Sequence, residues 1–150
     1  MKIAIGCDPN AEEAKRKLIA YIEKNALGKV TDFGSEDVIY AHVAIEVARN
    51  VAEKKYDRGI LLCGTGIGMC IAANKVQGAY AALVSDIYSA KRARLSNDAN
   101  ILCMGAFTTG EKVREELAEA FFRYEYDENS NSKDKVQAYK NYDAERQRGI

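Results

Sequence analysis

Short apolar runs alternate with longer amphipathic stretches along most of the chain. The run at 59–63 (GILLC) is almost continuously apolar, as expected of a central parallel strand that is covered on both faces. Between the runs, apolar residues recur at helical spacing, as at Ala14, Leu18 and Ile22. The pattern predicts strands at 2–7, 29–33, 59–63, 80–84 and 101–104, and helices at 10–25, 40–53, 67–75, 86–95, 110–123 and roughly 132–147.

Strands that alternate with helices imply right-handed crossover connections, and these build an open parallel sheet. We therefore expect an α/β fold: a doubly wound, mainly parallel five-stranded sheet with helices on both faces and a C-terminal helix. The length of 150 residues indicates a single domain, 1–150. The C-terminal helix has a modest apolar face (Val136, Tyr139 and Tyr142), which we expect to pack on a partner subunit.

Charge and hydropathy restrict the classes of partner. The chain has 22 Lys and Arg and 22 Asp and Glu, so it lacks the basic excess typical of proteins that bind nucleic acid or anionic membranes. It has no signal-peptide pattern, and no apolar run approaches the roughly 20 residues that span a bilayer. We expect a cytoplasmic protein that binds neither nucleic acid nor membrane.

Four cysteines and a single histidine, His42, are candidates for chemistry. The cysteines form no CxxC pair, so we expect no metal site. In a reducing compartment they are free thiols. Cys7, Cys70 and Cys103 are expected to be small buried residues of the core.

In open α/β sheets, ligands bind beyond the carboxyl ends of the strands. This edge of the predicted sheet carries the segments 7–8, 34–35 and 63–65 and the turn after Met104. These segments are therefore the first places to look for a functional site.

The most informative segment is 63–75 (CGTGIGMCIAANK), in which a strand, a glycine-rich turn and a helix follow in order. Gly64, Gly66 and Gly68 allow the backbone to approach a ligand closely, and the amides of such a turn bind anions. The turn matches neither the G-x-G-x-x-G dinucleotide pattern nor a P-loop, so we expect no nucleotide cofactor.

Cys63 stands directly before this turn, where the positive end of the following helix favours a thiolate. A thiolate acts either as a nucleophile, which usually needs a histidine partner, or as a base that abstracts a proton. Only His42 is available as a histidine partner, whereas a base needs only an oxyanion site of the kind that the turn supplies. These residues alone leave open whether Cys63 is catalytic or a buried cysteine beside a binding loop.

Four segments together resemble one known family. They are GCD at 6–8, CGTGIG at 63–68, AANK at 72–75 and SNDANILCMG at 96–105. In this combination they resemble the type B ribose-5-phosphate isomerase family, which also includes the galactose-6-phosphate isomerase subunits. The similarity covers nearly the whole chain in order.

The resemblance implies a Rossmann-like fold, no metal or other cofactor, and a homodimer or homotetramer with active sites at the subunit interface. It also implies interconversion of an aldose and a ketose phosphate through a cis-enediol. Cys63 falls on the family's base, and Thr65 on the threonine that hydrogen-bonds the substrate and helps to move the proton. The substrate-binding positions implied are Gly64, Gly66, Gly68 and Asn97 for the anion hole, and Asp8 and Tyr40 for the sugar.

The chain departs from the family pattern at several positions that contact the sugar phosphate. The ring-opening histidine is replaced by Ser96, and a sugar-binding aspartate by Ile39. The other departures are Pro9 for a histidine, Asn131 and Lys135 for phosphate-binding arginines, and Phe107 for an arginine that a partner subunit usually lends. Lys135 is still a candidate phosphate ligand, although lysine is a point charge and lacks the two-donor geometry of arginine.

These substitutions favour a shorter, acyclic substrate. Erythrose 4-phosphate cannot close a furanose or pyranose ring through its phosphorylated O4, so it needs no ring-opening histidine. The chain is also similar to the erythrulose-4-phosphate isomerase branch, for example in YDEN at 126–129. We therefore expect a tetrose 4-phosphate as substrate. The alternatives are a pentose or hexose phosphate isomerase, with ring opening left to solution or to His42, a non-catalytic sugar-phosphate-binding subunit, and a nucleotide-binding protein.

Overall fold

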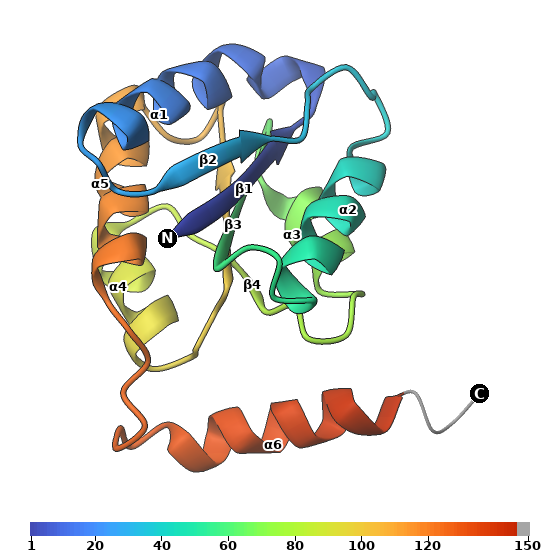
Figure 1. Cartoon of the computed structure of the whole chain (residues 1–150), viewed down its shortest axis with the longest axis vertical. Coiled ribbons are helices and arrows are strands. Elements are labelled where there is room, and N and C mark those ends of the chain that lie inside the picture. Colours follow the sequence, from blue (N-terminus) through green and yellow to red (C-terminus); the bar gives the residue numbers. More distant parts are fainter. Residues whose placement is uncertain (147–150) are drawn as a thin grey trace.

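The computed structural model describes residues 1–146 and contains a five-stranded sheet in the order β2-β1-β3-β5-β4 (Figure 1). Every pair of neighbouring strands is parallel. The strands are β1 (Lys2–Cys7), β2 (Lys29–Asp32), β3 (Arg58–Cys63), β4 (Ala81–Leu83) and β5 (Ile101–Gly105). The order of strands reverses between β1 and β3, the position at which open sheets bind their ligands.

Helices cover both faces of this sheet (Figure 1). One face carries α1 (Glu12–Lys24), α4 (Ile87–Leu95) and α5 (Glu111–Arg123), and the other carries α2 (Tyr40–Ala52) and α3 (Ile67–Ala73). A short 3₁₀ helix, η1 (Pro9–Ala11), precedes α1, and α6 (Lys133–Glu145) follows α5. The prediction of a Rossmann-like, doubly wound α/β fold with a C-terminal helix is confirmed.

The strands have buried side chains on both faces, which explains the two layers of helices. Along β1, Ile3 and Ile5 enter the core beneath α1 and α5, and Ala4 enters the core beneath α2 and α3. This follows from the alternation of side chains along a strand. In β3, residues 60–62 are all fully buried, so the continuous apolar run at 59–63 does mark the middle of the sheet.

The predicted boundaries hold to within a few residues, and the differences have local causes. The helix predicted from residue 10 starts as η1, with Pro9 in its first turn. Proline fits there because the first turn of a helix does not use the N–H that proline lacks, and because the fixed φ of proline is close to the helical value. The strand predicted at 80–84 is shorter in the structure, where β4 begins at Ala81. Tyr80 stays outside the strand, and its amide donates to the Asn100 side chain (2.8 Å). The predicted helix end at residue 147 lies outside the described residues.

The C-terminal helix α6 lies across the amino end of the sheet, apart from the other helices (Figure 1). Its main anchor is the buried carboxylate of Asp143, which accepts hydrogen bonds from the Gly78 amide (2.7 Å) and the Tyr80 hydroxyl (3.1 Å). Among the described helices, including α6, none combines the length and the apolar character needed to cross a membrane.

The apolar face predicted for α6 is only partly available to a partner. Val136 is buried within the chain, and the Tyr139 hydroxyl donates a hydrogen bond to the carbonyl of Asn97. Tyr142, in contrast, is 70% exposed. Packing of this helix on a partner subunit therefore stays a prediction, and Tyr142 is the residue through which it would occur.

Replacing Asp143 with Ala should loosen α6, because two donors of half-buried residues lose their acceptor. The expected loss is about 1–3 kcal/mol in the free energy of unfolding, or about 3–10 °C in Tm for a chain of this size. Asp134→Ala, at an exposed position of the same helix, is the matched control and should change Tm by less than about 2 °C. Differential scanning calorimetry measures both, and equal Tm values for the two variants would show that Asp143 is not an anchor.

Candidate active site

The carboxyl ends of β1, β3 and β5 meet at one edge of the sheet, because Cys7 pairs with Leu62, and Cys63 with Gly105. The loops that leave β3 and β5 are joined through their backbones, since the Ala106 amide donates to the Cys63 carbonyl (2.8 Å). The turn after β5 is therefore a fixed neighbour of the glycine turn after β3.

Cys63 ends β3 and directs its sulfur toward the glycine turn. The residue is only 5% exposed, and its Sγ accepts a hydrogen bond from the Gly66 amide at 3.0 Å. An amide donor at this distance stabilises negative charge on the sulfur. The structure thus brings together the thiol and one of the backbone donors that the sequence predicted to lie beside it.

This contact depends on the backbone conformation of Gly66, which is left-handed (φ +79°) and directly precedes α3. A Cβ atom at this position would lie 2.7 Å from Leu83 Cδ1 and 2.8 Å from the carbonyl carbon of Met104. Both the φ angle and the lack of space therefore require glycine here.

Thr65 lies at the exposed surface of the turn, one residue before Gly66. Its Oγ1 accepts a hydrogen bond from the Ile67 amide at 3.3 Å. A hydroxyl that accepts in this way keeps its own hydrogen for donation, so Thr65 can donate to a ligand at the mouth of the turn.

Tyr40, the first residue of α2, reaches the far end of the same turn. A Cβ on Gly68 would lie 2.3 Å from the Tyr40 hydroxyl oxygen, so the absence of a side chain at Gly68 makes room for the phenol. Tyr40 is 40% exposed and can contact a ligand. His42, on the first turn of the same helix, is mostly exposed and pairs with Asp37 (2.8 Å).

Asp8 follows β1 at the same edge and is 7% exposed. Its Oδ2 accepts from the Asn10 side chain at 3.4 Å, whereas its buried Oδ1 has no hydrogen-bond partner among residues 1–146. Buried carboxylate oxygens are normally satisfied, and an unsatisfied one next to a candidate site is a suitable acceptor for ligand hydroxyls.

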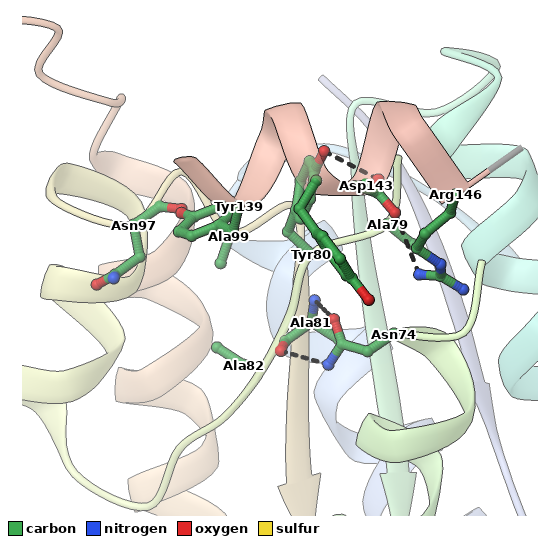
Figure 2. Close-up of a pocket in the computed structure, with 11 residues that line it drawn as sticks. Asn74, Ala79, Tyr80, Ala81, Ala82, Asn97, Ala99, Tyr139, Asp143 and Arg146 are labelled. Carbon is green, nitrogen blue, oxygen red and sulfur yellow. Dashed lines mark hydrogen bonds and ion pairs between the residues drawn. The ribbon is translucent and has the colours of Figure 1, made fainter. Parts of the chain in front are cut away.

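Two predicted substrate-binding residues do not join this site within one chain. Asn97 lies in the segment that leads into β5, whose first residue pairs with Gly59 at the amino end of β3. It lines a separate cavity of about 410 Å³ beneath α6, together with Tyr80 and Tyr139 (Figure 2). Lys135 is an exposed residue of α6 and lies at the same end of the sheet as Asn97.

Phe107 lies beside the glycine turn of its own chain. The family pattern suggested a partner-lent arginine at this position, but a Cβ on Gly64 would lie only 3.0 Å from two carbons of the Phe107 ring. The Phe107 amide also donates to the Gly64 carbonyl (2.9 Å). Within this chain, position 107 therefore lies next to the turn that follows Cys63.

The remaining three cysteines differ in burial and in thiol pKa, although the sequence predicted that all three are buried core residues. Cys7 and Cys103 are buried, as expected, and burial raises the pKa of Cys7 to about 12. Cys70 is only half-buried, and a hydrogen bond from the Cys103 thiol lowers the pKa of Cys70 to about 7. No sequence pattern signalled this thiol, because the effect arises from a contact between α3 and β5. Within residues 1–146, no three His, Cys, Asp or Glu side chains are grouped so as to hold a metal ion.

Comparison with known proteins gives consistent matches along the chain. The family model described as Ribose/Galactose Isomerase matches residues 3–139. Ribose-5-P isomerase B of Listeria innocua is 49% identical over 81% of this chain and 83% of its own length. D-erythrulose-4-phosphate isomerase of Pectobacterium atrosepticum is 43% identical over 85% of this chain and 86% of its own length. The solved type B ribose 5-phosphate isomerase of Trypanosoma cruzi aligns with a TM-score of 0.89 at 37% identity, covering 96% of this chain and 99% of that chain.

The lowered pKa of Cys70 predicts which thiol outside the glycine turn reacts first. As pH rises through about 7, Cys70 should become a thiolate and its alkylation by iodoacetamide should level off above about pH 8. Cys7, with a pKa of about 12, should stay unmodified over the same range. Mass spectrometry of the digested protein follows each cysteine separately. A Cys70 labelling midpoint near pH 9 would contradict the role given to the Cys103 hydrogen bond.

Proposed function

Since the chain belongs to the ribose/galactose isomerase family, we propose that it interconverts an aldose and a ketose tetrose 4-phosphate, with Cys63 as the base. The family relationship makes it a sugar-phosphate aldose–ketose isomerase. The preference for erythrulose 4-phosphate and erythrose 4-phosphate, and the roles of single residues, are our proposal. No cofactor is needed, because the reaction moves two hydrogens within one molecule.

In the proposed reaction, the Cys63 thiolate removes the proton from the carbon beside the carbonyl. The electron pair of that C–H bond becomes the double bond of the cis-enediol, and the carbonyl oxygen takes up the negative charge. Thr65 then relays a proton between the two oxygens, and the Cys63 thiol returns its proton to the former carbonyl carbon. The sugar phosphate therefore changes neither its composition nor its oxidation state.

The observation that carries this proposal is the contact between the Cys63 sulfur and the Gly66 amide at 3.0 Å. Amides of the turn that stabilise a thiolate before the reaction are also close enough to stabilise the enediolate that forms next to it. Thr65 on the exposed side of the turn and Tyr40 at its far end add polar groups that hold the sugar hydroxyls.

The preference for a tetrose rests on the surroundings of Ser96. This residue stands where the family has its ring-opening histidine, and its hydroxyl is buried with no hydrogen-bond partner among residues 1–146. A buried serine cannot protonate a ring oxygen, but an acyclic tetrose 4-phosphate needs no such step. The relatives include both a ribose and an erythrulose phosphate isomerase, so a pentose 5-phosphate is the alternative substrate.

We further propose that a second copy of the chain completes the site. Asn97 and Lys135 lie at the opposite end of the sheet from Cys63, and a two-fold dimer brings such distant surfaces of two copies together. Apolar side chains next to the glycine turn are exposed and suit an interface: Ile67 (51%), Ile71 (58%) and Leu83 (43%). In this arrangement, one copy contributes Cys63 and the other contributes Asn97 and Lys135.

The substrate assignment is tested by the ratio of two specificity constants. The value of kcat/KM for erythrose 4-phosphate should exceed that for ribose 5-phosphate by at least about tenfold, because only the pentose must open a ring before reaction. Coupled assays for the two ketose products measure both values on the same enzyme preparation. A larger kcat/KM for ribose 5-phosphate would favour the pentose alternative.

Cys63→Ala should lower kcat by about 10² to 10⁴-fold, because it removes the base. Cys70→Ser is the matched control in the same helix–turn region and should remain within about threefold of the wild type, since the reaction as proposed does not use Cys70. Full activity in Cys63→Ala would contradict the proposed chemistry.

The shared site adds a complementation test to the Cys63→Ala measurement. When Cys63→Ala is mixed with Asn97→Ala and the subunits are allowed to exchange, half of the dimers are mixed and each has one intact site. Activity should then recover to about 25% of the wild type. An Asn97→Ala variant that is fully active by itself would place Asn97 outside the site, and no recovery on mixing, with subunit exchange demonstrated by native mass spectrometry, would place it in the site of its own chain.

A further inference from the structure

One prominent side chain at the mouth of the glycine turn has no part in the proposed chemistry. Phe107 is 73% exposed, although it is a large apolar residue, and its ring lies against Gly64, the residue that follows Cys63. A ring this exposed gains little from burial within its own chain, so its apolar surface is available to a molecule that packs on it. The ring is therefore placed where a ligand held by the turn would meet it.

The loop that carries this ring is held firmly. The Phe107 amide donates to the Gly64 carbonyl at 2.9 Å, and the Thr109 hydroxyl donates to the Gly105 carbonyl at 2.6 Å. The guanidinium of the buried Arg114 donates to the carbonyls of Ala106 (3.4 Å) and Thr109. Because both sides of the loop are anchored, the backbone that carries the ring is already in place before a ligand binds.

The two ends of the glycine turn are bordered by different aromatic surfaces. Tyr40 borders Gly68 and has a hydroxyl that can bond to a sugar, whereas Phe107 borders Gly64 and has no polar atom. The face of a phenyl ring carries partial negative charge, so it attracts C–H groups and repels a phosphate dianion. A sugar hydroxyl turned toward the ring would also lose its hydrogen bond with water.

We propose that Phe107 is a specificity-determining residue whose ring packs on the C–H face of the bound sugar phosphate and limits the length of its carbon chain. A four-carbon substrate held at Cys63 places only carbon-bound hydrogens against the ring. A longer substrate brings an additional hydroxyl-bearing carbon, or the phosphate itself, against the same apolar surface. The inference rests on the proposed function, since it concerns a ligand bound at the Cys63 turn.

Binding measurements on a Cys63→Ala background test this inference without depending on turnover. Isothermal titration calorimetry gives Kd for erythrulose 4-phosphate and ribulose 5-phosphate, and the ratio of the two values is the readout. Adding Phe107→Ala should shift this ratio about tenfold toward ribulose 5-phosphate, the scale of discrimination that an apolar surface gives for one additional group. Phe107→Arg should shift the ratio at least as far in the same direction. Phe107→Tyr, which keeps the ring, is the matched control and should leave it within about twofold.

The outcomes separate this inference from the substrate assignment. An unchanged ratio in Phe107→Ala and Phe107→Arg, with both variants folded by circular dichroism, would overturn the role of the ring. Equal weakening of both sugars together with dissociation to a monomer in light scattering would also overturn it, because the ring would then be a subunit contact. If the starting protein itself prefers ribulose 5-phosphate, the tetrose assignment fails, but the direction of the shift on removing the ring still decides the inference.

Discussion

The hydrogen bond from the Gly66 amide to the Cys63 sulfur is the contact on which the proposed chemistry depends. It exists because Gly66 adopts a left-handed conformation, and that conformation is possible only because no side chain has to fit between Leu83 and Met104. Leu83 ends β4 and Met104 lies near the end of β5, which pairs with both β3 and β4, so the pairing of these three strands fixes the environment of the thiol. A shift of one residue in this pairing would place other atoms against Gly66 and change the space in which its conformation fits.

Much of the fold follows from the sequence because its signals are local. The continuous apolar run at 59–63 predicted a central strand, and the alternation of strands with amphipathic helices predicted the layers. The glycine turn was also predictable, since Cys63 and Gly66 are only three residues apart. Local sequence patterns could not predict the partners of the turn, because Tyr40 and Phe107 approach it from other elements, and only the family resemblance had named Tyr40 as a sugar-binding residue. For the same reason, the effect of Cys103 on the pKa of Cys70 is a tertiary contact without a sequence pattern.

The separation of the predicted site residues between two ends of the sheet has a plain geometric cause. Every strand is parallel, so residues that follow a strand and residues that precede it are a full strand length apart. Cys63 ends a strand, and Thr65 and Asp8 follow strands. Asn97, in contrast, precedes a strand, and Lys135 lies on α6 at the same end of the sheet as Asn97. A family motif lists such residues along one sequence and carries no information about which copy of the chain supplies each of them.

The glycines at 64 and 68 each make room for a side chain that is distant in the sequence: Phe107 for Gly64 and Tyr40 for Gly68. Substitutions within each pair should therefore be energetically coupled, so that a methyl group at position 68 is tolerated only when the phenol at position 40 is reduced in size. During evolution, a larger residue at one of these glycines would then require a second substitution at its partner position. A homologue that adds a side chain at position 68 alone would have to move the helix start that carries Tyr40, and with it the wall of the substrate site.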